Sequence, residues 1–109
     1  MDHVNYLDPK WLRPRIIVDI LDETLSRELE PEEWVGMDGF SIGFFEDGRA
    51  VIELMDTWGR FVYATIEEHN DHYLVKIVGG SPEIIDKILF KEFEIPKKEV
   101  EERVRIVLE

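Results

Sequence analysis

The chain has 109 residues, a formal net charge of -12 and no cysteine. This length supports one hydrophobic core and is too short for two, so we expect a single domain, residues 1–109. The negative charge disfavours direct binding to nucleic acid or anionic lipid. The absence of cysteine excludes disulfides, thiolate zinc sites and thiol nucleophiles.

No apolar run approaches the roughly 20 residues that span a bilayer, and the first residues lack the basic start and apolar stretch of a signal peptide. We therefore expect a cytoplasmic protein without membrane contact. The chain has no glutamine and only two asparagines, Asn5 and Asn70, but many Glu, Lys, Arg and Ile residues. This composition is typical of hyperthermophilic proteins and predicts a heat-stable, acidic surface.

Residues 1–39 predict a helical arm followed by an acidic connection. Proline suits the first position of a helix and interrupts one already running, so Asp8-Pro9 predicts a separate turn before a long amphipathic helix from Pro14 to Leu29. Pro31 ends the helix, and Trp34 is the one large apolar anchor of the connection. The apolar stripe expected to face the core is Ile16, Ile17, Ile20, Leu21, Leu25 and Leu29.

Residues 40–80 predict a four-stranded antiparallel meander. Asp47-Gly48 suits a two-residue type I′ hairpin, Asp56 to Gly59 suits a type I turn with a bulge, and Asn70-Asp71 closes the third hairpin. The strands are expected at Phe40 to Phe45, Arg49 to Asp56, Arg60 to Glu68 and His72 to Gly79. The turns set a register that pairs Glu46 with Arg49, Leu54 with Val62 and His69 with His72.

This register sorts apolar side chains onto two faces. The predicted core face carries Phe45, Ala50, Ile52, Leu54, Val62, Ala64, Ile66, Tyr73, Val75 and Ile77, with Ser41 and Gly43. The opposite face carries Phe40, Ile42, Phe44, Val51, Met55, Phe61, Tyr63, Leu74 and Val78, interleaved with charged residues. A one-sided sheet alternates apolar and polar residues, so a second apolar face requires a cover, either the C-terminal segment or another molecule.

The C-terminal segment, residues 81–109, leaves two interpretations open. Ser81-Pro82-Glu83 begins a good helix, with Ile84, Ile85, Ile88 and Leu89 at helical spacing. Leu89, Phe93 and Ile95 also lie on one face of a strand that runs into Pro96. After Pro96, Val100, Val104, Val107 and Leu108 fit a helix, whereas Val104, Ile106 and Leu108 alternate as a strand. The fold class is therefore α+β: a long N-terminal amphipathic helix, a four- or possibly five-stranded antiparallel meander and a C-terminal helix.

Three stretches resemble the α-crystallin domain of small heat-shock proteins: FFEDGRAVIEL at Phe44 to Leu54, EEHNDHYLVKIVGG at Glu67 to Gly80, and FKEFEIPKKEVEERVRIVL at Phe90 to Leu108. That family has strands of similar order, a tight turn, a strand that ends in glycine and a later strand that ends in Ile-Pro or Leu-Pro. The resemblance covers about two thirds of the chain. It implies ATP-independent holding of unfolding client proteins.

Few residues suggest a reaction. His69 and His72 lie opposite each other beside the Asn70-Asp71 turn, with Glu67 on the same face, and such donors suit zinc. Only a turn tip supports them and no second shell is evident, so they remain weak candidates and we predict no metal. None of the three serines lies in a Gly-x-Ser-x-Gly elbow. We expect neither an enzyme nor a cofactor.

The main hypothesis is a non-enzymatic protein-interaction module, which binds a partner protein or a second copy, with a dimer expected. The candidate interface residues are Phe40, Ile42, Phe44, Val51, Met55, Trp58, Phe61, Tyr63 and Leu74. One alternative is the small heat-shock-like holdase. Another is an acidic, antitoxin-like adaptor that covers a basic nucleic-acid-binding protein, because the net charge is -12.

Overall fold

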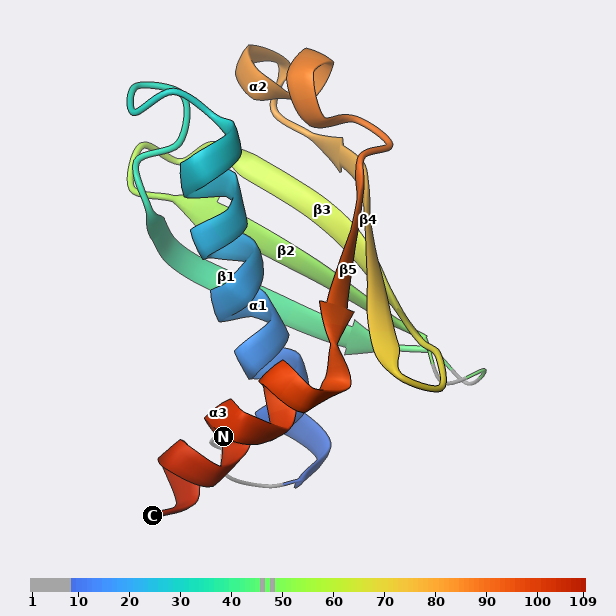
Figure 1. The fold of residues 1–109 in the computed structure, drawn as a ribbon. Helices are drawn as coiled ribbons and strands as arrows, with labels where there is room; N and C mark the ends of the chain where they lie inside the picture. The colour runs from blue at the N-terminus through green and yellow to red at the C-terminus, as the bar shows by residue number, and fades with distance from the viewer. Residues whose placement is uncertain (1–8, 46, 48) are drawn as a thin grey trace, which may run out of the picture.

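A five-stranded antiparallel sheet forms the centre of the computed structural model, which describes residues 9–45, 47 and 49–109. The strands follow the chain in the order β1-β2-β3-β4-β5 (Figure 1). Their bounds are Met37–Phe44 for β1, Ala50–Asp56 for β2, Phe61–Glu68 for β3, His72–Gly80 for β4 and Glu92–Pro96 for β5. The predicted meander is confirmed, and it has the fifth strand.

Three helices of the described residues accompany the sheet: α1 (Pro9–Glu28), α2 (Pro82–Ile88) and α3 (Lys97–Leu108). Figure 1 shows α1 lying across one face of the sheet, α2 at the end of β4, and α3 beside the first turns of α1. The buried residues of all three helices belong to one hydrophobic core, together with inward-facing strand residues. The fold is α+β, as predicted. No helix in the described part of the chain is long and apolar enough to cross a membrane.

Helix α1 begins earlier than the sequence predicts. It runs without interruption from Pro9 to Glu28 and contains Pro14, which was expected to start a second helix. Pro14 lacks the N–H that would bond to the carbonyl of Lys10, so this helix tolerates one missing bond near its N-terminus. All six residues of the predicted apolar stripe are buried, and Val18, which lies outside the stripe, is fully buried as well.

The acidic connection is tied to α1 through Asp22. Trp34 is 3% exposed, as expected for an anchor, and its indole Nε1 donates a hydrogen bond of 2.8 Å to the Asp22 carboxylate. The same carboxylate oxygen accepts the backbone N–H of Met37 at 3.1 Å. A polar residue of the helix therefore sets the place where β1 begins.

Two of the three predicted turns have the expected geometry. Gly59 N–H donates to the Asp56 carbonyl at 2.9 Å, and Gly59 has a φ of 80°, the left-handed conformation that glycine adopts without strain. His69 N–H donates to the His72 carbonyl at 2.9 Å and closes the third hairpin. Leu54 lies opposite Val62, so the alternation of β2, β3 and most of β4 is the predicted one.

The predicted register of β1 is wrong by one residue. Phe44, not Phe45, lies opposite Ala50, and Phe45 N–H donates to the Arg49 carbonyl at 2.9 Å. The expected two-residue turn includes Gly48, and the expected pairing includes Glu46; both positions lie outside the described residues. Because side chains alternate with a period of two, this shift moves every side chain of β1 to the other face.

Three candidate interface residues consequently lie on the helix side of the sheet. Phe40 and Ile42 lie opposite the buried Leu54 and Ile52 and pack against the core. Phe44 also faces α1, where its ring meets the ring of Trp11 with centroids 5.2 Å apart. Three residues predicted for the core lie on the opposite side: Ser41, Gly43 and Phe45, of which Phe45 is 49% exposed.

The C-terminal segment combines both interpretations that the sequence left open. Residues 82–88 form α2, which buries Ile84 and Ile88. The chain then turns at Phe90 into β5, where Ile95 is buried opposite Tyr73. After Pro96 it forms α3, which buries Val100 and Val104. The whole segment covers the helix side and one edge of the sheet, not its second face.

Two bidentate ion pairs join α1 to α3. Arg103 donates to both carboxylate oxygens of Glu23 at 2.6 and 3.0 Å, and Arg13 does the same for Glu101 at 2.6 and 3.0 Å. The hydrogen bonds hold the pKa of Glu23 and of Glu101 below its usual value of 4.5. Both carboxylates are about half exposed, so each pair contributes no more than about 1 kcal/mol.

We expect acid to weaken this helix contact. A carboxylate with a lowered pKa in the folded state stabilises the fold above its unfolded pKa, and this stabilisation is lost as the pH falls through the folded pKa. Thermal unfolding followed from about pH 6 to about pH 3 should show a falling midpoint. The fall should be smaller in a Glu23→Gln, Glu101→Gln double variant. Asp19 opposes the trend, because burial raises its pKa. An equal acid sensitivity in both proteins would contradict the assignment.

Candidate functional site

One face of the sheet carries apolar residues that no described helix covers. We call it the open face: the outward side of β2, β3 and β4, whose apolar residues include Val51, Met55, Phe61, Tyr63 and Leu74; Val78 of β4, 41% exposed, lies at the irregularity in the pairing of β4 with β3. None of these five belongs to the hydrophobic core or to the residues packed against it. Tyr63 is 37% exposed, and the other four are partly buried. All five were predicted candidates.

Aromatic rings form the middle of the open face. Phe61 and Tyr63 are two residues apart on β3 and therefore point the same way. Their rings are stacked, with centroids 6.3 Å apart and planes 15° apart. Met55 lies opposite Phe61 on β2, and Gly79 lies opposite Tyr63 on β4. The result is an apolar surface with two stacked aromatic rings, which suits contact with another protein.

Trp58 lies in the turn between β2 and β3, at one end of the sheet. It is 67% exposed, and the guanidinium of Arg60 lies 5.1 Å from the centre of its ring. Arg60 is held in turn by Asp56, which is 0% exposed and accepts hydrogen bonds from the backbone N–H groups of Trp58 and Arg60 at 3.0 and 2.9 Å. A buried carboxylate therefore fixes the loop that displays an exposed tryptophan.

Phe90 extends the apolar surface toward the β4–β5 edge, and the sequence did not identify it. It is 63% exposed, and its backbone has a φ of 64°, a left-handed conformation that residues other than glycine and asparagine rarely adopt. Hydrogen bonds around the turn hold it there, including one from Phe90 N–H to the Ile77 carbonyl at 2.9 Å. Lys76, on the outward side of β4, places its ammonium 5.6 Å from the centre of the ring.

Charged residues interrupt and border the open face. Glu53 lies opposite Tyr63, in the middle of the apolar residues. Glu92 and Glu94 lie on the same side of β5, opposite Lys76 and Leu74. Among the side chains that the structure describes, no lysine or arginine lies within ion-pair distance of Glu53, Glu92 or Glu94. This face thus combines an apolar surface with carboxylates, one of them, Glu53, among the apolar residues and two on β5.

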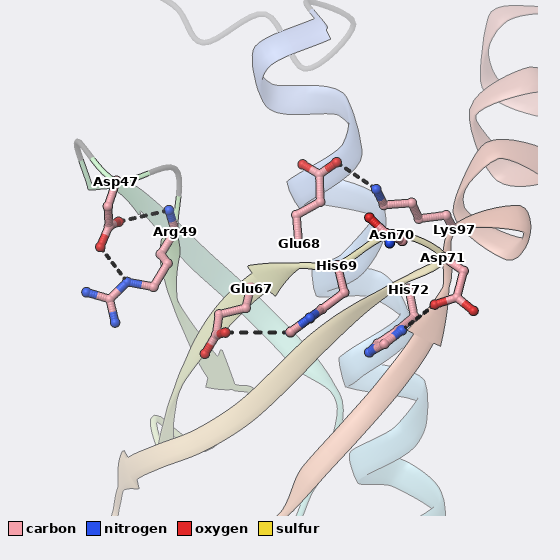
Figure 2. A pocket seen from close by; sticks show the side chains of 9 residues that line it. All are labelled: Asp47, Arg49, Glu67, Glu68, His69, Asn70, Asp71, His72 and Lys97. Carbon is pink, nitrogen blue, oxygen red and sulfur yellow. Dashed lines mark hydrogen bonds and ion pairs between the residues drawn. The ribbon is translucent and has the colours of Figure 1, made fainter.

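The two histidines lie at the other end of the sheet, in a hollow beside the β3–β4 turn (Figure 2). Their rings stack face to face, with centroids 4.8 Å apart and planes 7° apart. His69 Nε2 lies 3.6 Å from Glu67, while His72 Nδ1 lies 2.7 Å from Asp71. The hydrogen bond with His72 holds the pKa of Asp71 below its usual range.

The hollow is mixed in charge and is not built as a metal site. Figure 2 shows Lys97 bonded to Glu68 at 2.7 Å and Arg49 bonded to Asp47 at 2.8 Å, so its cations are already paired with carboxylates of the chain. The histidine rings stack flat on each other instead of converging with Glu67 on one point. Within residues 9–45, 47 and 49–109, no group of three or more His, Asp or Glu side chains is placed to hold a metal ion.

Comparison with known proteins identifies no relative: no family model, curated protein or solved structure matches this chain. The resemblance to small heat-shock proteins therefore stays a prediction.

Proposed function

We propose that this protein is a non-enzymatic protein-binding module that uses the open face of its sheet. The observation that carries the proposal is the set of five apolar side chains, with Phe61 and Tyr63 stacked at their centre, outside the core and under no described helix. Contiguous apolar surface of this kind on a small domain is typical of a binding site. A cytoplasmic location and a heat-stable surface are part of the same proposal.

Two further observations support a protein as the ligand. A sheet face with a stacked tyrosine and phenylalanine has the composition of interface hot spots, and the described hollow, where a small molecule would bind, lies at the β3–β4 turn and not on these rings. The acidic surroundings and the net charge of -12 disfavour nucleic acid and anionic membranes. The partner is a second protein or a second copy of this chain.

The test removes apolar surface without disturbing the core. We expect a Met55→Ser, Tyr63→Ser double variant to lose at least about tenfold in binding, because hot-spot aromatics contribute about 2 kcal/mol or more. Binding is measured by light scattering at high protein concentration and by recovery of partners from the source lysate on immobilised protein. Thermal unfolding should change little, since both side chains lie outside the core.

The matched control removes exposed apolar surface elsewhere. Ile106 and Leu108 of α3 are 68% and 62% exposed, and an Ile106→Ser, Leu108→Ser variant should bind as the wild type does. A strictly monomeric wild type that recovers no partner would end the proposal. So would a Met55→Ser, Tyr63→Ser variant that keeps the binding of the wild type.

A further inference from the structure

The carboxylates of the open face lie beside apolar side chains and have no lysine or arginine partner among the described residues. On the helix side, three carboxylates are paired with cations of the same chain, Glu23 with Arg103, Glu101 with Arg13, and Glu28 with Lys91, whereas exposed carboxylates such as Glu102 are not paired within the described part of the chain. On the open face, Glu53 and Glu92 have no such partner among the described side chains. Glu67 and Glu94 approach only histidines, at 3.6 and 3.8 Å.

The cations nearest to these carboxylates make other contacts. Lys76 lies opposite Glu92 in the register, yet its ammonium lies over the ring of Phe90. Arg49, at the edge of the face, is bonded to Asp47 at 2.8 Å and lies 5.6 Å from the centre of the Phe45 ring. The chain therefore leaves negative charge on this face that its own cations do not neutralise.

This charge argues against a second copy as the occupant. Two copies packed face to face would place both sets of carboxylates, Glu53, Glu67, Glu92 and Glu94 from each, in one interface between molecules that each carry a net charge of -12. Like charges across an interface repel and oppose association, whereas opposite charges attract and orient a partner. Glu53 is the most informative of the four, because it lies opposite Tyr63 and any partner that covers the ring also covers the carboxylate.

We propose that the open face binds a segment of another protein that is both apolar and basic. The apolar side chains of that segment would contact Phe61 and Tyr63, and its lysines or arginines would pair with Glu53 and with Glu92 at the β5 edge. The exposed ring of Phe90, in its strained backbone position, adds apolar surface beside Lys76. This inference rests on the proposed function and specifies the chemistry of the partner.

The experiment uses defined peptides as probes with the full chain. A short amphipathic peptide of leucine and lysine is compared with a leucine–glutamate peptide of the same pattern and a lysine–serine peptide of the same charge. Calorimetry should show binding of the leucine–lysine peptide alone, and added salt should weaken it. The Glu53→Gln variant should weaken this binding about five- to tenfold, and Tyr63→Ser at least as much.

Glu102→Gln is the matched control, because Glu102 is an exposed carboxylate on α3, away from the open face. This substitution should change the peptide affinity less than about twofold. Equal binding of the leucine–glutamate and leucine–lysine peptides would overturn the inference and leave the proposed function intact. A protein that binds no peptide but self-associates, and loses this self-association in the Tyr63→Ser variant, would also overturn the inference and leave the proposed function intact. The occupant of the open face would then be a second copy. Peptide binding that Glu53→Gln and Tyr63→Ser leave unchanged would place the peptide elsewhere and overturn the inference. Neither peptide binding nor self-association would overturn both proposals.

Discussion

Replacing Asp56 with alanine is expected to lower the free energy of unfolding by about 3 to 5 kcal/mol, because it removes one partner of a buried ion pair. Asp56 is 0% exposed, and its second carboxylate oxygen accepts a hydrogen bond from Arg60 Nε at 2.9 Å. Arg60 also donates to the Glu32 carbonyl at 2.8 Å, which ties the β2–β3 turn to the acidic connection. The Asp56→Ala variant would leave the Arg60 guanidinium without its anion.

Chemical denaturation measures this loss, and two variants separate its causes. Asp56→Asn keeps an oxygen for the backbone N–H groups of Trp58 and Arg60 but loses the charge, so we expect an intermediate loss. Asp47→Ala is the matched control: Asp47 makes the same kinds of bond to Arg49, to its backbone N–H and its Nε, but it is exposed. If Asp56→Ala cost no more than Asp47→Ala, burial of the carboxylate would not be what stabilises the turn.

The same turn shows how much of this fold the sequence determines locally. Aspartate in the first position and glycine in the last predicted the turn correctly, and the turn set the register of β2 against β3. That register in turn placed Val51, Met55 and Phe61 on one face, so part of the candidate site followed from short-range rules alone. The burial of Asp56 did not follow, because it depends on residues far away in the chain, such as Glu32.

The error in β1 has an identifiable physical origin. The prediction took the register from the preferred turn type at Asp47-Gly48, although Phe40, Ile42 and Phe44 already alternate with the small residues Ser41 and Gly43. In the structure the large residues face the core and the small ones face outward, as the alternation alone would indicate. The burial of a whole row of side chains outweighs the preference of one turn for a particular turn type, because turn types differ little in free energy.

Neither turn preference nor strand alternation could have placed Phe90 from the sequence. The position of its side chain is set by a left-handed turn between α2 and β5, and hydrogen bonds to Ile77 stabilise that turn. Glycine or asparagine at this position would have signalled the turn; phenylalanine does not. Periodicity could not decide between helix and strand in this segment because each apolar run is short and the two elements follow each other within a few residues.

Lysine at two neighbouring positions of β2 is expected to unfold the protein at one position and to leave the fold intact at the other. Ile52 is 0% exposed and lies between Ile42 and Ala64, so Ile52→Lys would bury a charge without a partner. That penalty amounts to several kcal/mol, comparable with the whole stability of a domain of this size, and we expect the variant to be largely unfolded. Val51 points to the open face, where a lysine can reach water, so Val51→Lys should fold with a thermal midpoint close to that of the wild type.

The two variants separate the fold from the binding site. Val51→Lys should also weaken binding of the leucine–lysine peptide by about tenfold. The lysine removes apolar contact area and places a cation two residues from Glu53 on the same face. Far-UV circular dichroism on heating follows the fold, and calorimetry follows the peptide. A folded Ile52→Lys variant with a normal midpoint would contradict the alternation of β2. A folded Val51→Lys variant with undiminished peptide affinity would instead leave the sheet as described and remove the open face as the place where a basic partner binds.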